Sequence, residues 1–133
     1  HSPIRGQHKQ MEQGIRIFVK FFGGERASEA ADYFRKLGMR VIIFDEAETT
    51  EALKLFDTEY YRVCINFAQR VKVYCENHNL NYSEVYRLAN QTYNEGYTKL
   101  GHPEFVRPVL EPIKGPTGGH CVMPNSKLIK LSE

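Results

Sequence analysis

The chain has 133 residues, 41% of them hydrophobic and 26% charged, which is enough for about one domain with a buried core. A formal net charge of +2, with no run of five like charges, argues against a nucleic-acid or membrane surface as a partner. The chain has three cysteines and no apolar span of 18 residues, which favours a reducing compartment, so we expect a cytoplasmic protein.

The first third of the chain has the pattern of a βαβ unit. Residues 16–22 are rich in branched and aromatic side chains and end at two glycines, as a strand before a turn does. Residues 27–37 have apolar side chains at helical spacing, and Gly38 follows where a left-handed cap is expected. Residues 39–44 form an apolar run typical of a buried strand. We therefore predict an α/β fold in which residues 1–45 form a short parallel βαβ unit that docks on a larger sheet or partner.

After this unit the pattern becomes helical. Asp45, with Glu48 three residues on, is typical of a helix start, and the helix is expected to run to about Asn79. Apolar residues recur in it at spacings of three and four, and further apolar residues widen this stripe: Leu53, Phe56, Tyr60, Val63 and Phe67, with Cys64, Ala68, Val71 and Cys75. Residues 46–133 are therefore predicted to form a mainly α-helical domain. The stripe needs a partner, which is either a second copy of the chain or the next helix, capped by Asn81.

A cysteine follows a glycine turn near the end of the chain. In the stretch Gly118-Gly119-His120-Cys121 the glycines leave backbone N–H groups free, and these groups, His120 and Lys114 would favour the nucleophilic thiolate. Composition alone favours a different interpretation, a flexible loop with an incidental thiol.

Three segments, in the same order along the chain, resemble the nucleotide-sugar dehydrogenases, the UDP-glucose and GDP-mannose 6-dehydrogenase family. Residues 118–125 are similar to its Gly-Gly-x-Cys-x-x-x-Asp signature, and residues 50–56 to its Ala-Glu-Leu-x-Lys helix start. Residues 1–24 are similar to the Ser-Pro-Glu segment and the strand ending in Gly-Gly that close the family's NAD domain. The resemblance spans nearly the whole chain, as a fragment covering the end of that Rossmann-like domain and the helical middle domain.

The resemblance implies an NAD-dependent oxidation of the C6 hydroxyl of a nucleotide sugar to a uronic acid. It implies that Cys121 is the covalent nucleophile, forming a thiohemiacetal and then a thioester with C6. It implies that Lys54 stabilises oxyanions at C6, helped by Thr58, which stands where the family has an asparagine. In the family the long helix forms the dimer core, which implies a homodimer.

Substrate contacts are expected from the glycine turn and from one arginine. Gly118, Gly119 and His120 surround the predicted nucleophile, and Arg107 is a candidate phosphate or sugar contact, with a solvated arginine as the alternative. For Lys54, the residues alone favour an ordinary surface lysine paired along its helix.

Two other positions depart from the family pattern. Ile4 stands in place of the glutamate that takes part in activating water, and Asn125 in place of an aspartate. Neither side chain exchanges a proton near neutral pH, so turnover is expected to be impaired.

The chain also lacks two parts of the family. No G-x-G-x-x-G fingerprint occurs, so NAD is implied by resemblance only, with no cofactor-binding residue in this chain. The nucleotide-sugar-binding domain downstream of the cysteine is missing as well. We therefore expect this chain alone not to be a competent enzyme, and the alternative is a non-catalytic dimerisation or interaction module derived from the family. No metal site is expected, because Cys75 and His78 have no second close pair of ligands.

Overall fold

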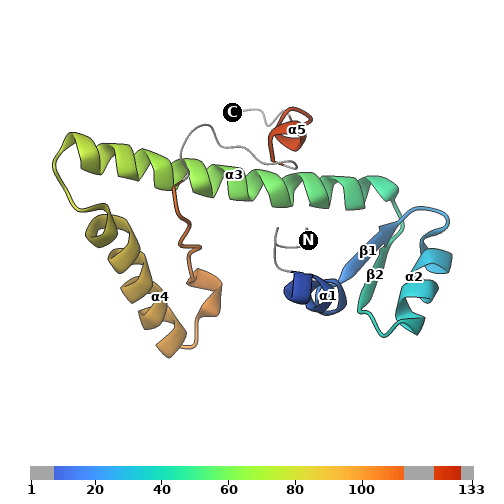
Figure 1. Cartoon of the computed structure of the whole chain (residues 1–133). Helices are drawn as coiled ribbons and strands as arrows, with labels where there is room; N and C mark the ends of the chain where they lie inside the picture. The colour runs from blue at the N-terminus through green and yellow to red at the C-terminus, as the bar shows by residue number, and fades with distance from the viewer. Residues whose placement is uncertain (1–7, 113–121, 130–133) are drawn as a thin grey trace. The chain divides into compact units, whose positions relative to one another are not determined.

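The computed structural model describes residues 8–112 and 122–129, with side chains from residue 12 on (Figure 1). The chain forms two compact units, His1–Lys54 and Leu55–Glu133. This division falls inside the longest helix, α3 (Ala47–Asn77), nine residues after the boundary expected at residue 45. The described part is mostly helical, with a two-stranded parallel sheet.

The first unit contains the strand–helix–strand order that the sequence predicts. Its elements are α1 (His8–Ile17), β1 (Lys20–Gly23), α2 (Ala27–Lys36) and β2 (Val41–Phe44), followed by the start of α3. The two strands pair in parallel, with Lys20 opposite Val41 and Gly23 opposite Phe44. The parallel pairing predicted from the pattern is therefore present.

Helix α2 packs on one face of this small sheet. Ala27 and Ala31 of α2 are buried, and the rings of Phe22 and Phe34 lie 5.2 Å apart. Gly38, after the helix, has the left-handed conformation predicted for it, with φ +76°, and its N–H donates to the Arg35 carbonyl at 2.9 Å.

The predicted first strand was wrong at its beginning. Residues 16 and 17 end helix α1, and the strand starts only at Lys20. The reason is that β2 offers just four residues for pairing, so the chain before Lys20 finds its hydrogen bonds within a helix instead. The Phe18 N–H, for example, donates to the Gly14 carbonyl at 3.1 Å.

The second unit is helical. It contains most of α3, the π-helical turn η1 (Ser83–Leu88), α4 (Ala89–Lys99), the 3₁₀ turn η2 (Pro103–Phe105) and α5 (Val122–Ser126). Helix α3 begins at Ala47 and ends at Asn77, each within two residues of the predicted ends. The predicted cap of the next helix is present, because the Asn81 side-chain oxygen accepts from the Ser83 N–H at 2.9 Å.

The segment 106–111 is attached to η1 and α4 by polar contacts. The Asn94 amide bonds the backbone of Arg107 twice, accepting from its N–H and donating to its carbonyl, each at 2.8 Å. Farther along, the Arg87 guanidinium donates to both carboxylate oxygens of Glu111 at 2.7 and 2.8 Å. The chain therefore reaches residue 111 along a path fixed by side chains of the preceding helix.

The apolar stripe predicted on the long helix is largely exposed. The five residues that recur at spacings of three and four are between 36% and 57% exposed: Leu53, Phe56, Tyr60, Val63 and Phe67. In contrast, Ala68 and Cys75 of the same helix are buried. The rings of Phe67 and Tyr86 lie 6.4 Å apart, so the next helical segment covers the stripe only in part. The stripe's need for a partner therefore stays a prediction.

One prediction concerns Gly23. A Cβ atom here would overlap the backbone carbonyl of Glu46, and the Cα atom of Ala47 would lie only 3.1 Å from it. Gly23→Ala should therefore destabilise the first unit by roughly 1–3 kcal/mol. Amide exchange of β1 and β2 and urea unfolding of the intact chain measure this loss.

The matched control is Gly14→Ala in α1, where the nearest atoms to a new Cβ are 3.9 Å away. Since alanine favours a helix over glycine, this change should leave stability unaltered or raise it by up to about 1 kcal/mol. Equal effects of the two substitutions would contradict the close approach at Gly23.

Candidate functional site

A hydrogen bond joins two residues that the sequence assigns to one site. The Asn125 Nδ2 group of α5 donates to the Thr58 hydroxyl oxygen of α3 at 3.2 Å, across 67 positions of sequence. Thr58 is only 6% exposed, and Asn125 is half-buried. Both residues belong to the second unit, and Figure 1 shows α5 beside α3.

The Thr58 hydroxyl uses its single proton within its own helix. It donates to the Leu55 carbonyl at 2.8 Å while it accepts from Asn125. A hydroxyl has one proton to donate, and the bond to Leu55 uses it in this arrangement. An asparagine at this position would have two donors, which is the difference expected from the sequence.

Helix α5 places Asn125 and begins directly after the predicted nucleophile. It starts at Val122, and the Lys127 N–H donates to the Pro124 carbonyl at 3.3 Å as the turn ends. Cys121 itself lies outside the described residues, as do Gly118, Gly119 and His120. Ile4 also lies outside them, so the roles assigned to these five positions stay predictions.

Lys54 lies on α3 one helical turn before Thr58 and is half-buried. Residues four apart on an α-helix share a face, so the helix directs both side chains to similar sides.

Beside Thr58, the structure shows an ion pair that was not singled out in the sequence. The Arg62 guanidinium donates to both carboxylate oxygens of Glu59, at 2.7 and 2.5 Å, and Glu59 is 9% exposed. The hydrogen bonds from Arg62 lower the pKa of Glu59 below its ordinary value, outweighing the opposing effect of burial. A carboxylate held ionised in this way is suited to fixing local structure rather than exchanging protons near neutral pH. The only sequence signal was the i, i+3 spacing of the two charges.

Arg107 lies elsewhere in the second unit. Its guanidinium carbon is 3.5 Å from the centroid of the Tyr93 ring, and its backbone is bonded to Asn94. Its described contacts include neither Thr58 nor Asn125. The structure therefore brings Thr58 and Asn125 together, with Arg107 in a separate environment.

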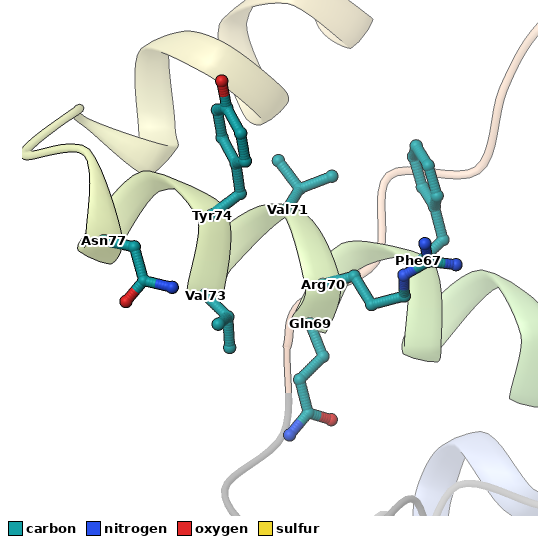
Figure 2. Close-up of a pocket in the computed structure, with 7 residues that line it drawn as sticks. All are labelled: Phe67, Gln69, Arg70, Val71, Val73, Tyr74 and Asn77. Carbon is teal, nitrogen blue, oxygen red and sulfur yellow. The ribbon is translucent and has the colours of Figure 1, made fainter.

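One hollow in this unit follows α3. It encloses about 620 Å³ and is lined by seven residues of that one helix: Phe67, Gln69, Arg70, Val71, Val73, Tyr74 and Asn77. Figure 2 shows Tyr74 and Val71 pointing to one side of the helix and Gln69 and Val73 to the other. Because these side chains diverge, they do not make a converging set of ligand contacts.

The glycine turn after β1 is crowded rather than open. The space beside Gly23 and Gly24 is filled by the backbone of Glu46 and by Ala47. A pyrophosphate site needs that space open so that backbone N–H groups can approach the ligand. The turn after β1 therefore lacks the open space that a pyrophosphate site needs.

Within residues 8–112 and 122–129, no group of three or more histidine, cysteine, aspartate or glutamate side chains is placed to hold a metal ion. None of the helices in the same ranges combines the length and apolarity needed to cross a membrane.

Comparison of the chain with models of known protein families, with curated proteins and with solved structures finds no match.

The Glu59–Arg62 pair gives a prediction about pH. Because the folded-state pKa of Glu59 is lowered, its ionised form contributes stability above the ordinary pKa of 4.5, and this contribution is lost as pH falls through the lowered value. Arg62→Met should destabilise the chain at neutral pH by about 1–2 kcal/mol, a figure reduced for the partial exposure of Arg62. The difference from the unaltered chain should shrink as pH falls below about 4.

Urea unfolding between pH 3 and pH 8 measures this difference. Lys72→Met is the control, because its exposed partner Glu76 lies 3.8 Å away and such pairs contribute little. If Arg62→Met lowers the free energy of unfolding by the same amount at every pH in this range, Arg62 does not lower the pKa of Glu59.

Proposed function

We propose that this chain is a fragment or divergent member of an NAD-dependent nucleotide-sugar 6-dehydrogenase. The observation that supports this most is the hydrogen bond between Asn125 and Thr58. The resemblance assigned these two positions to a single site from separate motifs, 67 residues apart, and their contact is what a shared site requires. A chance likeness between short motifs gives no reason for the two positions to meet.

In the proposed chemistry, the chain's own residues supply the covalent and electrostatic steps. The Cys121 thiolate adds to the C6 carbonyl carbon of the aldehyde form of the sugar, forming a C–S bond, while the carbonyl π electrons move to oxygen. The Lys54 ammonium stabilises the resulting oxyanion. Thr58, one helical turn after Lys54, is the position where the resemblance implies help with the oxyanion, and its hydroxyl also donates to the Leu55 carbonyl.

The same contact argues for weak turnover. Asn125 and Thr58 are neutral groups bonded to each other, and neither accepts a proton near neutral pH. NAD would supply hydride acceptance in the parent enzyme, but this sequence has no dinucleotide fingerprint and its turn after β1 is filled by Glu46 and Ala47. We therefore propose that the cysteine is reactive in this chain while complete oxidation is not supported by the chain alone.

The second candidate is a non-catalytic dimerisation or interaction module of the same origin. The observation in its favour is the exposed apolar stripe of α3, where Phe56 is 52% and Phe67 57% exposed. A homodimer through this stripe is compatible with both candidates, since it would remove the same side chains from water. A cytoplasmic location is likewise part of the proposal.

Cysteine reactivity separates the two candidates. If Cys121 lies among backbone N–H groups near Lys54, its pKa should fall below the ordinary value of about 8.5, and it should react with iodoacetamide faster than Cys64 and Cys75. Lys54→Ala should then slow the alkylation of Cys121 at pH 7 by about threefold to tenfold, because loss of a nearby cation raises the thiol pKa. Peptide mass spectrometry measures each cysteine separately.

Lys36→Ala is the matched control, since Lys36 lies at the end of α2 and not on α3. If Cys121 reacts no faster than a free thiol and ignores Lys54→Ala, the two residues do not share a site and the interaction module is the better interpretation.

The stripe predicts self-association. Sedimentation at micromolar concentration should give a dimer, and Phe56→Glu should shift it to a monomer, because a charge at the centre of an apolar contact is not solvated. Leu100→Glu, which alters a residue outside α3 that is 71% exposed, should leave the dimer intact. A monomer in the unaltered protein would exclude the homodimer.

A further inference from the structure

A smaller hollow of the second unit has a different composition from the one along α3. It encloses about 260 Å³, and its walls come from α3, from η1 and α4, and from the 106–111 segment. Its lining has four mainly apolar residues, which are Val63, Phe67, Tyr86 and Pro108. The other lining residues are the two polar residues Asn90 and Arg107 and the cysteine Cys64. It shares no residue with the Thr58–Asn125 contact.

The arginine of this hollow is held in place without an acidic partner. The Asn94 amide fixes the Arg107 backbone by two hydrogen bonds of 2.8 Å, and the guanidinium lies 3.5 Å over the Tyr93 ring. Stacking occupies a face of the guanidinium and leaves its N–H edge available. Within the described ranges, no carboxylate forms an ion pair with Arg107.

The apolar part of the hollow combines a fixed wall with exposed ones. Tyr86 is 5% exposed, its ring is stacked on Tyr82 at 5.2 Å, and its hydroxyl accepts from the Leu110 N–H at 3.3 Å. Val63 and Phe67 opposite are 51% and 57% exposed. A ligand in the hollow would remove this apolar surface from water without first having to reorganise Tyr86.

We propose that this hollow binds a small organic anion with an aromatic or branched apolar body. The Arg107 edge suits a carboxylate or a phosphate, since both accept two parallel hydrogen bonds from a guanidinium. The volume lies just below the range of about 300–1,000 Å³ usual for small-molecule pockets, so a whole nucleotide sugar does not fit. A free sugar is a poor match as well, because only Asn90 and Arg107 offer polar groups to its many hydroxyls. The site is separate from the proposed enzyme site and does not depend on it. It shares Val63 and Phe67 with the apolar stripe, so a ligand here and a homodimer through the stripe would compete for the same surface.

The hollow contains its own reporter, the free thiol of Cys64. In the full chain, alkylation of Cys64 by iodoacetamide is followed by peptide mass spectrometry with one of four probes added: phenylacetate, phenyl phosphate, acetate or 2-phenylethanol. We expect at least one aromatic anion to slow the modification of Cys64 about fivefold or more at millimolar concentration, an affinity usual for ligands of this size. Acetate lacks the ring and phenylethanol lacks the charge, so each should protect less than about twofold. Whichever aromatic anion protects better identifies the head group as carboxylate or phosphate.

Arg107→Met tests the role of the charge and keeps the length of the side chain. It should weaken protection by at least about tenfold, the loss expected for a hydrogen bond to a charged group. Arg107→Lys keeps the charge, so Cys64 should be protected more in this variant than in Arg107→Met. Because lysine has no planar guanidinium, the same variant shows how much the contact with Tyr93 contributes to protection. Arg70→Met alters an exposed arginine of α3 outside this hollow and should have no effect.

Three results would overturn the proposal. One is no protection by either aromatic anion. Another is equal protection by phenylethanol, or protection that survives Arg107→Met, since either would mean that the charge does not take part. The third is protection that grows with protein concentration and without any probe, which would show that a second copy of the chain fills the hollow.

Discussion

The packing of the second unit depends on which side chains of α3 are buried and which are exposed. This helix has 31 residues, and at 1.5 Å per residue it is about 46 Å long, too long for the remaining described elements to cover on all sides. Thr58, Ala68 and Cys75 are buried, while Phe56 and Phe67 are more than half exposed. The helix therefore has one side that meets its own chain and another whose apolar surface is left to water or to a partner.

Where apolar packing is sparse, paired polar contacts fix the path of the chain. Asn94 bonds both backbone groups of Arg107, and Arg87 bonds both oxygens of Glu111. Each contact is double, so it restricts orientation as well as distance. Such contacts allow a segment without regular secondary structure to keep a defined position over helices that offer little apolar area.

Patterns over many residues were predictable from the sequence, and single contacts were not. The parallel βαβ order and the left-handed Gly38 follow from local periodicity and glycine chemistry. The start of β1 was wrong because pairing length depends on the partner strand rather than on residues 16–22 themselves. In the candidate site, the family resemblance pointed to Thr58 and Asn125, but their contact depends on how α5 packs on α3, which local patterns do not predict.

The bond between Asn125 and Thr58 joins two side chains that carry no charge at any ordinary pH. An aspartate at position 125 would make the attachment of α5 to α3 sensitive to acid and to salt. Its carboxylate would be neutralised by protonation at low pH, and its charge would be screened by dissolved ions. Because an amide and a hydroxyl carry no charge, the strength of this bond does not change with pH or salt concentration. The bond that holds Asn125 to Thr58 therefore does not depend on the ionisation of either partner.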